Sequence, residues 1–291
     1  MTSVAIITDS CASIPDEFYG ELGISMVPYN LHIGKEARKD LVDIGRDEFF
    51  AYLAQATEIP KTANPAVGDY IEAYRRALQD HQAVISLHMT SRGSGAYQSA
   101  SLAKTTMAGE LPPGARIEVV DTLNVSMCHG WMTIEAARAA RAGRSVDEIL
   151  ALLHKMIPVA KMIQTADTLR YLYLGGRIGR AKHLVASLLN IKPLVSMEEG
   201  VIVALGTARS RLSAFKRMAE LVEQHVGPGG KIKLALVHVA ALEEAKQLRD
   251  MVEAKVTSVE TVFTQLSPVL SVHTGPGTVG LCYYPVAGIE I

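Results

Sequence analysis

The first half of the chain alternates short apolar runs with segments of helical periodicity. Apolar runs at residues 4–9, 83–87 and 116–121 predict β-strands. Over residues 67–80, apolar side chains recur every three or four positions and so share one face of a predicted helix. Strands that alternate with helices are typical of a mostly parallel sheet. We therefore expect an α/β domain in this half.

Three more helices are predicted in the same half. One spans residues 94–107, and another spans residues 125–142 and ends near Gly143, a residue type that commonly terminates helices. The third begins after Ser145. Ser145 and Glu148 have the spacing of a capping box, in which each side chain bonds the backbone N–H of the other residue.

The second half of the chain shows a different pattern. Two apolar runs, at residues 191–197 and 201–205, flank Glu198, Glu199 and Gly200, a short turn that suits a β-hairpin. A hairpin pairs its strands antiparallel, so we expect a mixed sheet here. Further strands are predicted at residues 233–239, 259–265, 269–272 and 280–284, and helices at residues 208–226 and 241–255.

These patterns predict two α/β domains, the first with a mostly parallel sheet and the second with a mixed sheet that includes a hairpin. The length of 291 residues favours two domains, because single hydrophobic cores stop growing near roughly 250 to 300 residues. We place the domains at residues 1–158 and 159–291. The segment at residues 25–62 is assignable to either domain.

Composition and charge narrow the classes of function. Hydrophobic residues make up 48% of the chain and charged residues 20%, which is typical of a globular protein and excludes a disordered one. With 29 basic and 30 acidic side chains the formal net charge is -1, so no overall field attracts nucleic acid, and we expect no nucleic-acid partner. The nine histidines lack the spacing of a metal site, and we expect no metal.

The sequence also indicates a cellular location. No apolar run approaches the roughly 20 residues that span a bilayer, and the N-terminal segment lacks the basic region and apolar stretch of a signal peptide. The three cysteines, Cys11, Cys128 and Cys282, are odd in number and widely spaced, which agrees with a reducing compartment. We therefore expect a cytoplasmic protein without stable membrane insertion.

Short loops rich in glycine, serine and threonine follow several predicted strands. Such loops commonly form a ligand crevice at the carboxyl ends of parallel strands. Asp9 and Ser10 follow the first strand, and Ser94 and Gly95 follow the strand at residues 83–87. Ser94 lies where the chain enters a helix, so its hydroxyl and the free backbone N–H groups either hold an anion or simply cap the helix.

Three other positions have both a functional and a structural interpretation. Thr62 lies three residues before Pro65, in a segment that leads into a helix, and alone it is typical of an ordinary helix approach. Arg177 follows a glycine pair that either admits a ligand or ends a helix, and its guanidinium equally suits a salt bridge. His273 follows a predicted strand and begins a rigid turn that contains Gly275. No spacing completes a hydrolase around Ser94.

Taken in order, these segments resemble the DegV family of bacterial fatty-acid-binding proteins. The match covers nearly the whole chain, and seven motifs in one order are hard to obtain by chance. The motifs are ITDSCASIP (7–15), KTANP (61–65), SGAYQSA (94–100), DTLNVSMCHG (121–130), TLRYLYLGGRIG (168–179), LLNIKPLVS (188–196) and HTGPG (273–277).

The resemblance implies an acyl chain in a tunnel between or beside the two domains. It places the carboxylate of a long-chain fatty acid such as palmitate on the hydroxyls of Thr62 and Ser94, with His273 and Arg177 near the head group. The loops around the head group contain Asp9, Ser10, Gly95 and Gly275. It further implies no catalytic residue, no cofactor, and a separate fatty-acid kinase subunit that phosphorylates the carboxyl group.

The chain departs from the family pattern at several positions near these hydroxyls. Ala63, Asn64 and Ala66 stand where the family usually has serine, glutamine and serine. Ala96 replaces a threonine, and Gly93 replaces a common leucine. The retained Thr62 and Ser94 preserve the head-group hydroxyls, whereas the lost hydroxyls alter the hydrogen bonds behind them.

Physical reasoning favours binding over catalysis. Each buried methylene contributes about 0.8 kcal/mol, so a tail of roughly 14 methylenes offers on the order of 11 kcal/mol before ordering costs. The carboxylate then needs only enough donors to avoid a buried unpaired charge. The alternatives are an acyl or phosphoryl transferase, with His273 as acid or base and Ser94 or Thr62 as nucleophile, and an interaction module in which the loops are only turns.

Overall fold

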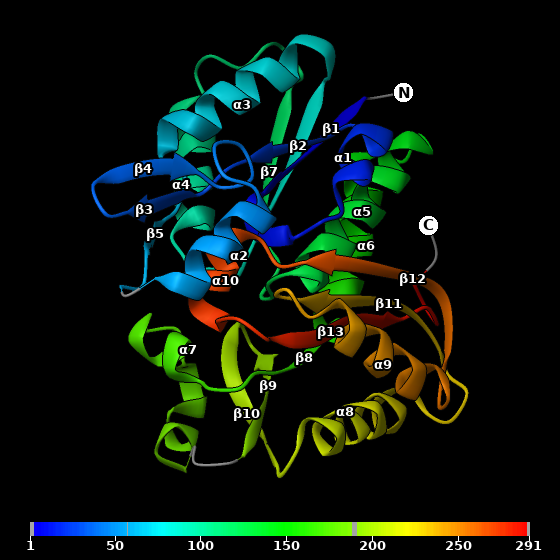
Figure 1. Cartoon of the computed structure of the whole chain (residues 1–291). Coiled ribbons are helices and arrows are strands. Elements are labelled where there is room, and N and C mark those ends of the chain that lie inside the picture. Colours follow the sequence, from blue (N-terminus) through cyan, green and yellow to red (C-terminus); the bar gives the residue numbers. More distant parts are fainter. Residues whose placement is uncertain (1–2, 57, 188–190, 290–291) are drawn as a thin grey trace.

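Two large β-sheets lie one above the other, with helices packed against them (Figure 1). The computed structural model describes residues 3–56, 58–187 and 191–289. The upper sheet has four strands in the order β2-β1-β6-β7, and the lower sheet has six in the order β10-β9-β8-β13-β11-β12. One sheet is parallel and the other is mixed, so the predicted α/β fold class is confirmed. The domain boundary at residue 159 stays a prediction.

The upper sheet is parallel throughout and covered on both faces. Its strands are β1 (Val4–Asp9), β2 (Ile24–Val27), β6 (Ala83–His88) and β7 (Arg116–Asp121), which include the three predicted strands. Side chains on alternate positions pack in two directions, as a strand requires. Those on one face meet helices α3 (Val67–Asp80) and α4 (Ala96–Thr106), and those on the other meet α5 (Met127–Arg141).

The lower sheet contains the predicted hairpin. Strands β9 and β10 pair antiparallel around Glu199 and Gly200, and among the described strands of this sheet only β11 and β12 pair in parallel. Helices α8 (Arg211–Val226) and α9 (Leu242–Glu253), also predicted, pack on one face of the sheet. The strands are β8 (Lys161–Thr165), β9 (Lys192–Glu198), β10 (Val201–Ala208), β11 (Lys231–His238), β12 (Thr257–Gln265) and β13 (Val279–Pro285). Residues 188–190 of the predicted LLNIKPLVS motif lie outside the described residues.

The remaining helices are short or join the two halves. The predicted capping box is confirmed at α6, where the Ser145 hydroxyl accepts from the Glu148 N–H (3.3 Å) and the Glu148 carboxylate accepts from the Ser145 N–H (2.8 Å). These helices are η1 (Ser10–Ala12), α1 (Asp16–Leu22), α2 (Arg46–Gln55), α6 (Val146–Val159), α7 (Arg170–Leu174) and η2 (Gly179–Ser187).

One predicted strand is wrong. Residues 269–272 belong to a helix, α10 (Pro268–Thr274), and not to a strand. The hydroxyl of Ser267 accepts from the Leu270 N–H (3.4 Å), and Pro268 occupies the first helical turn, where its missing N–H costs nothing. A serine cap followed by proline therefore outweighs the apolar run, and His273 lies in the last turn of a helix.

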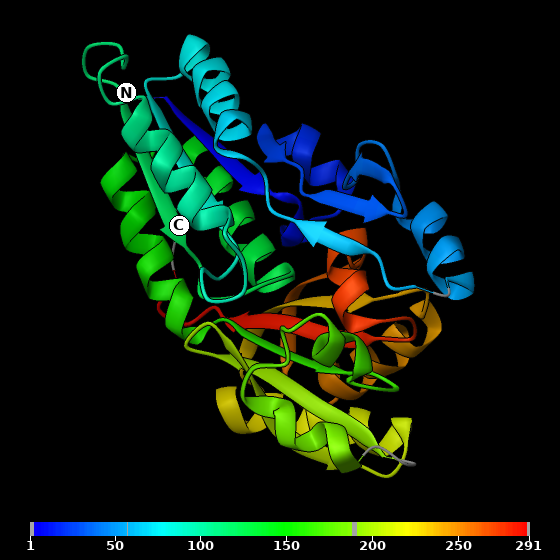
Figure 2. The same ribbon diagram turned by 90° about the vertical axis from the view of Figure 1, so that its left-hand side faces the viewer.

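The unassigned segment at residues 25–62 contains the end of β2, helix α2 and most of a small third sheet in the order β4-β3-β5. All strands of this small sheet pair antiparallel. Helix α10 contacts this small sheet, and Figure 2 shows α10 between it and the lower sheet. The strands are β3 (Asn30–Ile33), β4 (Glu36–Lys39) and β5 (Lys61–Ala63).

Helix α5 lies between the two large sheets. Its side chains are buried on every side, which explains why its sequence shows little helical periodicity. The indole N–H of Trp131 donates to the carbonyl of Cys282 in β13 (3.3 Å), while Thr133 donates to the Thr8 hydroxyl in β1 (3.4 Å). One hydrophobic cluster thus continues from the upper sheet through α5 to the lower sheet.

The hairpin of the lower sheet docks on the loop that follows β6. Glu199 and Gly200 have φ of 49° and 80°, the left-handed conformation that two-residue hairpin turns require. The Thr90 hydroxyl donates to the Gly200 carbonyl (2.9 Å), and a Cβ atom at Gly200 would overlap this hydroxyl. Only glycine suits both the turn and the contact.

Asp40 follows strand β4 and is fully buried. Its Oδ1 accepts from the Val269 N–H (3.3 Å) in the first turn of α10, and within the described residues its Oδ2 has no hydrogen-bond partner. Burial raises the pKa of this carboxyl to about 7, against the opposing effects of the Ser10 and Ser267 hydroxyls and the Arg46 charge. The carboxyl of Asp40, which titrates, therefore connects the small sheet to α10.

Replacing Gly200 with alanine is expected to destabilise the fold by about 1 to 3 kcal/mol, the usual cost of a strained backbone residue, plus the cost of displacing Thr90. Gly34 is a matched control, because it has a φ of 60° in another hairpin turn and open space around it. Urea unfolding should show a larger loss for Gly200→Ala than for Gly34→Ala. Equal losses would show that the Thr90 contact adds nothing.

Replacing Asp40 with asparagine is expected to change how stability depends on pH. The unfolded carboxyl has an ordinary pKa of 3.8 and the folded one a pKa of about 7, so the folded state binds more protons between these values. The wild type therefore loses up to about 1.4 kcal/mol per unit as pH rises through that window. The variant lacks this loss, so its free energy of unfolding relative to wild type should increase from pH 5 to pH 8. Parallel curves in urea unfolding would contradict the raised pKa.

Candidate functional site

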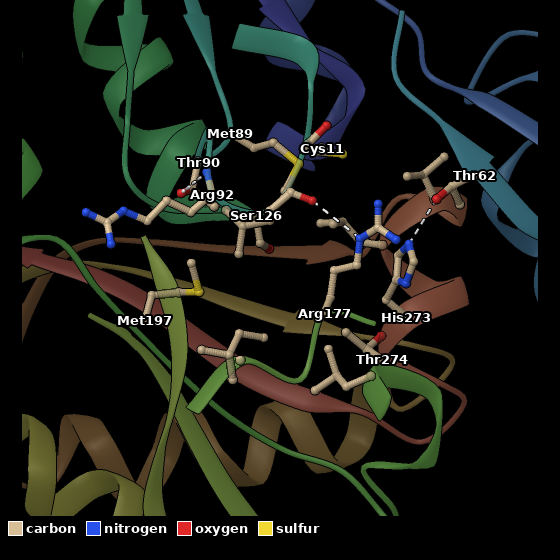
Figure 3. Close-up of a pocket in the computed structure, with 18 of the residues that line it drawn as sticks. Cys11, Thr62, Met89, Thr90, Arg92, Ser126, Arg177, Met197, His273 and Thr274 are labelled. Atoms are coloured by element: carbon tan, nitrogen blue, oxygen red, sulfur yellow. Dashed lines mark hydrogen bonds between the residues drawn. The ribbon is translucent and has the colours of Figure 1, made fainter. Parts of the chain in front are cut away.

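A cavity of about 410 Å³ lies between the two large sheets (Figure 3). Its walls come from the loops after β1 and β6, the small sheet, helix α10 and the hairpin of the lower sheet. Much of the wall is aliphatic or sulfur-bearing. These side chains are Cys11, Met89, Val125, Met162, Leu172, Met197, Ile202, Leu266, Val269 and Leu270. Such a mostly apolar cavity with few polar groups is typical of a small-molecule site.

Thr62 and His273 form a hydrogen-bonded pair in this wall. Thr62 belongs to β5 and pairs with Leu31 of β3, while His273 lies in the last turn of α10. The Thr62 hydroxyl and the His273 Nε2 are 3.0 Å apart. Two segments that are 211 residues apart in sequence therefore meet at the cavity (Figure 3).

His273 is neutral at physiological pH. Burial, and then the nearby Arg177 charge, lower the pKa of its imidazole to about 4. A neutral imidazole has one N–H donor and one acceptor nitrogen. Its Nδ1 is buried without a hydrogen-bond partner in the described part of the chain, beside Gly175, where a Cβ atom would overlap the ring. If the imidazole proton is on Nε2, this N–H donates to the Thr62 hydroxyl oxygen. The proton of the Thr62 hydroxyl is then free to bond a ligand.

Ser94 and Tyr29 form a second pair of the same kind. Their hydroxyl oxygens are 2.6 Å apart, and the Ser94 oxygen also accepts from the Ala96 N–H (3.3 Å). Ser94 lies directly before Gly95, which is the cap residue of α4, and it lines the cavity. Ser94 therefore both stabilises the start of this helix and contributes to the cavity wall. Burial raises the pKa of the Tyr29 phenol well above its usual value, so this phenol keeps its proton and is able to donate it to Ser94.

Arg177 and Gly95 lie beside these pairs. The Arg177 Nη1 donates to the Gly175 carbonyl (2.7 Å) and its Nε to the Gly93 carbonyl (3.4 Å), so the side chain connects the segment after α7 with the loop after β6. Among the described residues Arg177 has no carboxylate partner, so these residues do not form the salt bridge that the sequence equally suggested. Gly95 lines the cavity where a Cβ atom would lie 2.9 Å from the Asn64 Oδ1.

The other three predicted residues do not line the cavity. Asp9 is fully buried behind it and accepts from the N–H groups of Cys11 (3.0 Å) and Met89 (3.2 Å). The Ser10 hydroxyl accepts from the Tyr29 N–H (3.2 Å). Gly275 ends α10 with a φ of 82°, against the ring of Tyr171, where a Cβ atom would overlap. These residues hold the loops in place, and ligand contact by any site residue stays a prediction.

Tyr29 is the main site residue that the sequence reading missed. It lies in the unassigned segment at residues 25–62, just before β3. Apolar Tyr29, Leu31 and Ile33 alternate with polar Asn30 and His32 in the sequence, the pattern of a half-buried strand. That short pattern was the available signal for the strand. No spacing links Tyr29 to Ser94, which is 65 residues away.

The site combines neutral hydrogen-bonding groups with the charged guanidinium groups of Arg92 and Arg177. Within residues 3–56, 58–187 and 191–289 no group of three or more His, Cys, Asp or Glu side chains is arranged to hold a metal ion. None of the helices in that part of the chain is long and apolar enough to cross a membrane. Two hydroxyls backed by an imidazole and a phenol suit an oxygen acceptor at the end of an apolar ligand.

Comparison with known proteins shows relatives of nearly the same length. The chain is 31% identical over 287 residues to a DegV domain-containing protein of Halalkalibacterium halodurans, and 33% identical over 288 residues to one of Deinococcus radiodurans. Each match covers 98% of this chain and 99% of the relative.

Solved structures share the fold. A DegV family protein of Thermus thermophilus, described for its fatty acid binding, has 29% identity and a TM-score of 0.91, with 98% of this chain and 100% of that chain covered. DegV of Bacillus subtilis, described as a fatty acid binding protein, has 27% identity and a TM-score of 0.86 over the same shares. The family model described as "Uncharacterised protein, DegV family" matches residues 3–286. The chain therefore belongs to the DegV family.

Proposed function

We propose that this protein binds a long-chain fatty acid in the cytoplasm, with the carboxylate on Thr62 and Ser94 and the acyl chain in the apolar cavity. The observation that carries the proposal is that two hydroxyls line one cavity and that each is hydrogen-bonded to a second side chain that is able to donate. The fatty acid binding described for the relatives from Thermus thermophilus and Bacillus subtilis supports it.

The hydrogen-bond directions explain how two hydroxyls serve one carboxylate. When the His273 Nε2–H donates to Thr62, the threonine proton is left for the ligand. When the Tyr29 phenol donates to Ser94, the serine proton is left in the same way. Each hydroxyl then donates to an ionised oxygen, and such charge-assisted bonds are about twice as strong as neutral ones. Arg177 adds positive charge beside the head group without entering this set.

The cavity volume is compatible with an acyl chain. If each methylene takes about 30 Å³, the volume of one water molecule in the liquid, 410 Å³ holds about 14 such groups. Burial at about 0.8 kcal/mol per methylene makes the tail the main source of affinity. The head-group hydroxyls then decide between an acid and other lipids of equal length.

The geometry favours binding over a transferase reaction. Ser94 pairs with Tyr29, so a His273–Ser94 pair is not formed, whereas Thr62, the other nucleophile of that alternative, does pair with His273. With a pKa of about 4, His273 is a weak base, and in the described residues no carboxylate orients its Nδ1. The chain also has no GxxxxGK[ST] phosphate loop. We infer that phosphorylation of the bound acid requires a separate kinase.

Lipid extraction tests the carrier function directly. Protein purified without added lipid is expected to release long-chain fatty acid, detected by native mass spectrometry and by mass spectrometry of the extract. Incubation with ATP alone should return the acid unchanged. Purified protein that neither contains nor takes up fatty acid would contradict the binding proposal, and acyl phosphate formed without a second protein would contradict the need for a kinase.

The Thr62→Ala/Ser94→Ala double variant tests the head-group site. Each hydroxyl that donates to an ionised group contributes about 1.5 to 3 kcal/mol, so palmitic acid affinity should fall at least about a hundredfold. Affinity for hexadecanol should fall much less, because an uncharged head group needs less compensation. Calorimetric titration with both ligands measures the difference.

A thermal melt of the same variant provides the control for folding. Ser94 also accepts from the Ala96 N–H at the start of α4, so a loss of about 1 kcal/mol in stability is expected. Unchanged acid affinity together with a large drop in melting temperature would show that the two hydroxyls are structural and that the head group lies elsewhere.

A further inference from the structure

The cavity holds a second polar position, away from the Thr62–His273 pair. Ser126 lines the wall next to Thr90 and Met197 in the view of Figure 3, while Thr62 and His273 lie at the other side of that view. Ser126 is only 4% exposed, and its hydroxyl has no hydrogen-bond partner within the described residues. A buried hydroxyl without a partner costs stability unless something else satisfies it.

Ser126 also fails to act as the helix cap that its position suggests. It is the residue before α5, where a serine hydroxyl normally accepts from the first free N–H groups, but it makes no such bond. Its φ of 56° and ψ of -147° are unusual for a residue with a side chain. A conformation of this kind costs about 1 to 3 kcal/mol and is concentrated at functional sites. The backbone thus costs stability, and the unpaired hydroxyl is buried beneath the cavity wall, where a change of side-chain rotamer would turn it toward the cavity.

Gln164 adds a second polar side chain to the lining of the cavity. It lies in β8, is 5% exposed, and shares its strand face with Met162, which also lines the cavity. Its side-chain amide makes no hydrogen bond to any described residue, although an amide has two N–H donors and an acceptor oxygen. Ser126 and Gln164 come from different elements, the start of α5 and strand β8 of the lower sheet.

An unsubstituted acyl chain leaves both groups unsatisfied. Its methylenes accept and donate nothing, so contact with it removes water from the Gln164 amide without replacement and leaves the Ser126 hydroxyl unpaired. A chain that carries an oxygen satisfies them, and a site with unpaired polar groups discriminates strongly in favour of the ligand that pairs them. We propose that the cavity takes a long-chain fatty acid with an oxygen substituent on its chain, hydrogen-bonded by Ser126 and Gln164. This inference rests on the proposed function and names its substrate class.

Binding of matched ligand pairs tests the proposal. The probes are stearic acid, a series of hydroxystearic acids with the hydroxyl at different carbons, and stearic acids with a methyl branch at the same carbons. The methyl group matches the hydroxyl in size but forms no hydrogen bond. At one or more carbons the hydroxy acid should bind at least about fivefold tighter than its methyl counterpart, the equivalent of one net hydrogen bond.

Three variants locate the effect. Ser126→Ala and Gln164→Leu should each reduce the hydroxyl-to-methyl affinity ratio toward one at that carbon. Ser196→Ala is the control, because Ser196 is a buried serine on β9 whose hydroxyl donates to the Met162 carbonyl (2.6 Å) and does not line the cavity. That variant should keep the wild-type ratio. The ratio is a property of folded protein alone, and Gln164→Leu provides the answer if Ser126→Ala does not fold.

The outcomes separate this inference from the proposed function. If wild-type protein binds stearic acid but no hydroxy acid exceeds its methyl counterpart, the oxygenated substrate class is wrong and fatty-acid binding stands. A ratio that persists in Ser126→Ala and Gln164→Leu also overturns the assignment of these residues. If the wild type binds none of the acids, the proposed function itself fails.

Discussion

The structure depends on the packing of helix α5 between the two large sheets. Its side chains are buried toward both, with Trp131 bonded to β13 and Thr133 to β1. Because protein interiors are close-packed, a helix held on two sides fixes the separation and orientation of the sheets. The cavity opens where α5 begins, at Val125 and Ser126, and there the sheets are separated by loops and not by a packed helix. The size of the ligand space is thus set by where this helix starts.

Fixed sheets allow distant segments to meet with hydrogen-bond precision. Thr62, Ser94 and His273 come from the small sheet, the loop after β6 and a short helix of the second half, yet all three line the same cavity. A seven-residue helix has almost no stability of its own, so α10 takes its position from its contacts. Asp40 supplies one through Val269, and its backbone N–H also donates to the Tyr29 carbonyl (2.9 Å). Asp40 therefore contacts both α10, which carries His273, and Tyr29, which pairs with Ser94.

The elements that the sequence predicted are those whose local signals agree with their environment. The parallel strands, the hairpin around Gly200 and the capping box at Ser145 each combine an apolar pattern with suitable turn or cap chemistry. Residues 269–272 were misread because a four-residue apolar run fits a buried strand and a buried helix equally well. The small sheet was left unassigned since its strands have three or four residues each, too few to establish a period.

The residues of the site also divide into those that the sequence predicts and those that only the structure reveals, for a physical reason. Thr62, Ser94 and His273 lie in or beside segments rich in glycine and hydroxyls, which have a recognisable composition, so the family resemblance predicts them as head-group residues. Tyr29 supports Ser94 through a hydrogen bond between residues that are 65 positions apart, and such a contact leaves no periodic pattern in the sequence. Ser126 is harder still, because its signal is a hydroxyl that does not form the bond its position predicts. The sequence indicates which hydrogen bonds a residue is able to form, but only the structure shows which of these bonds are not formed.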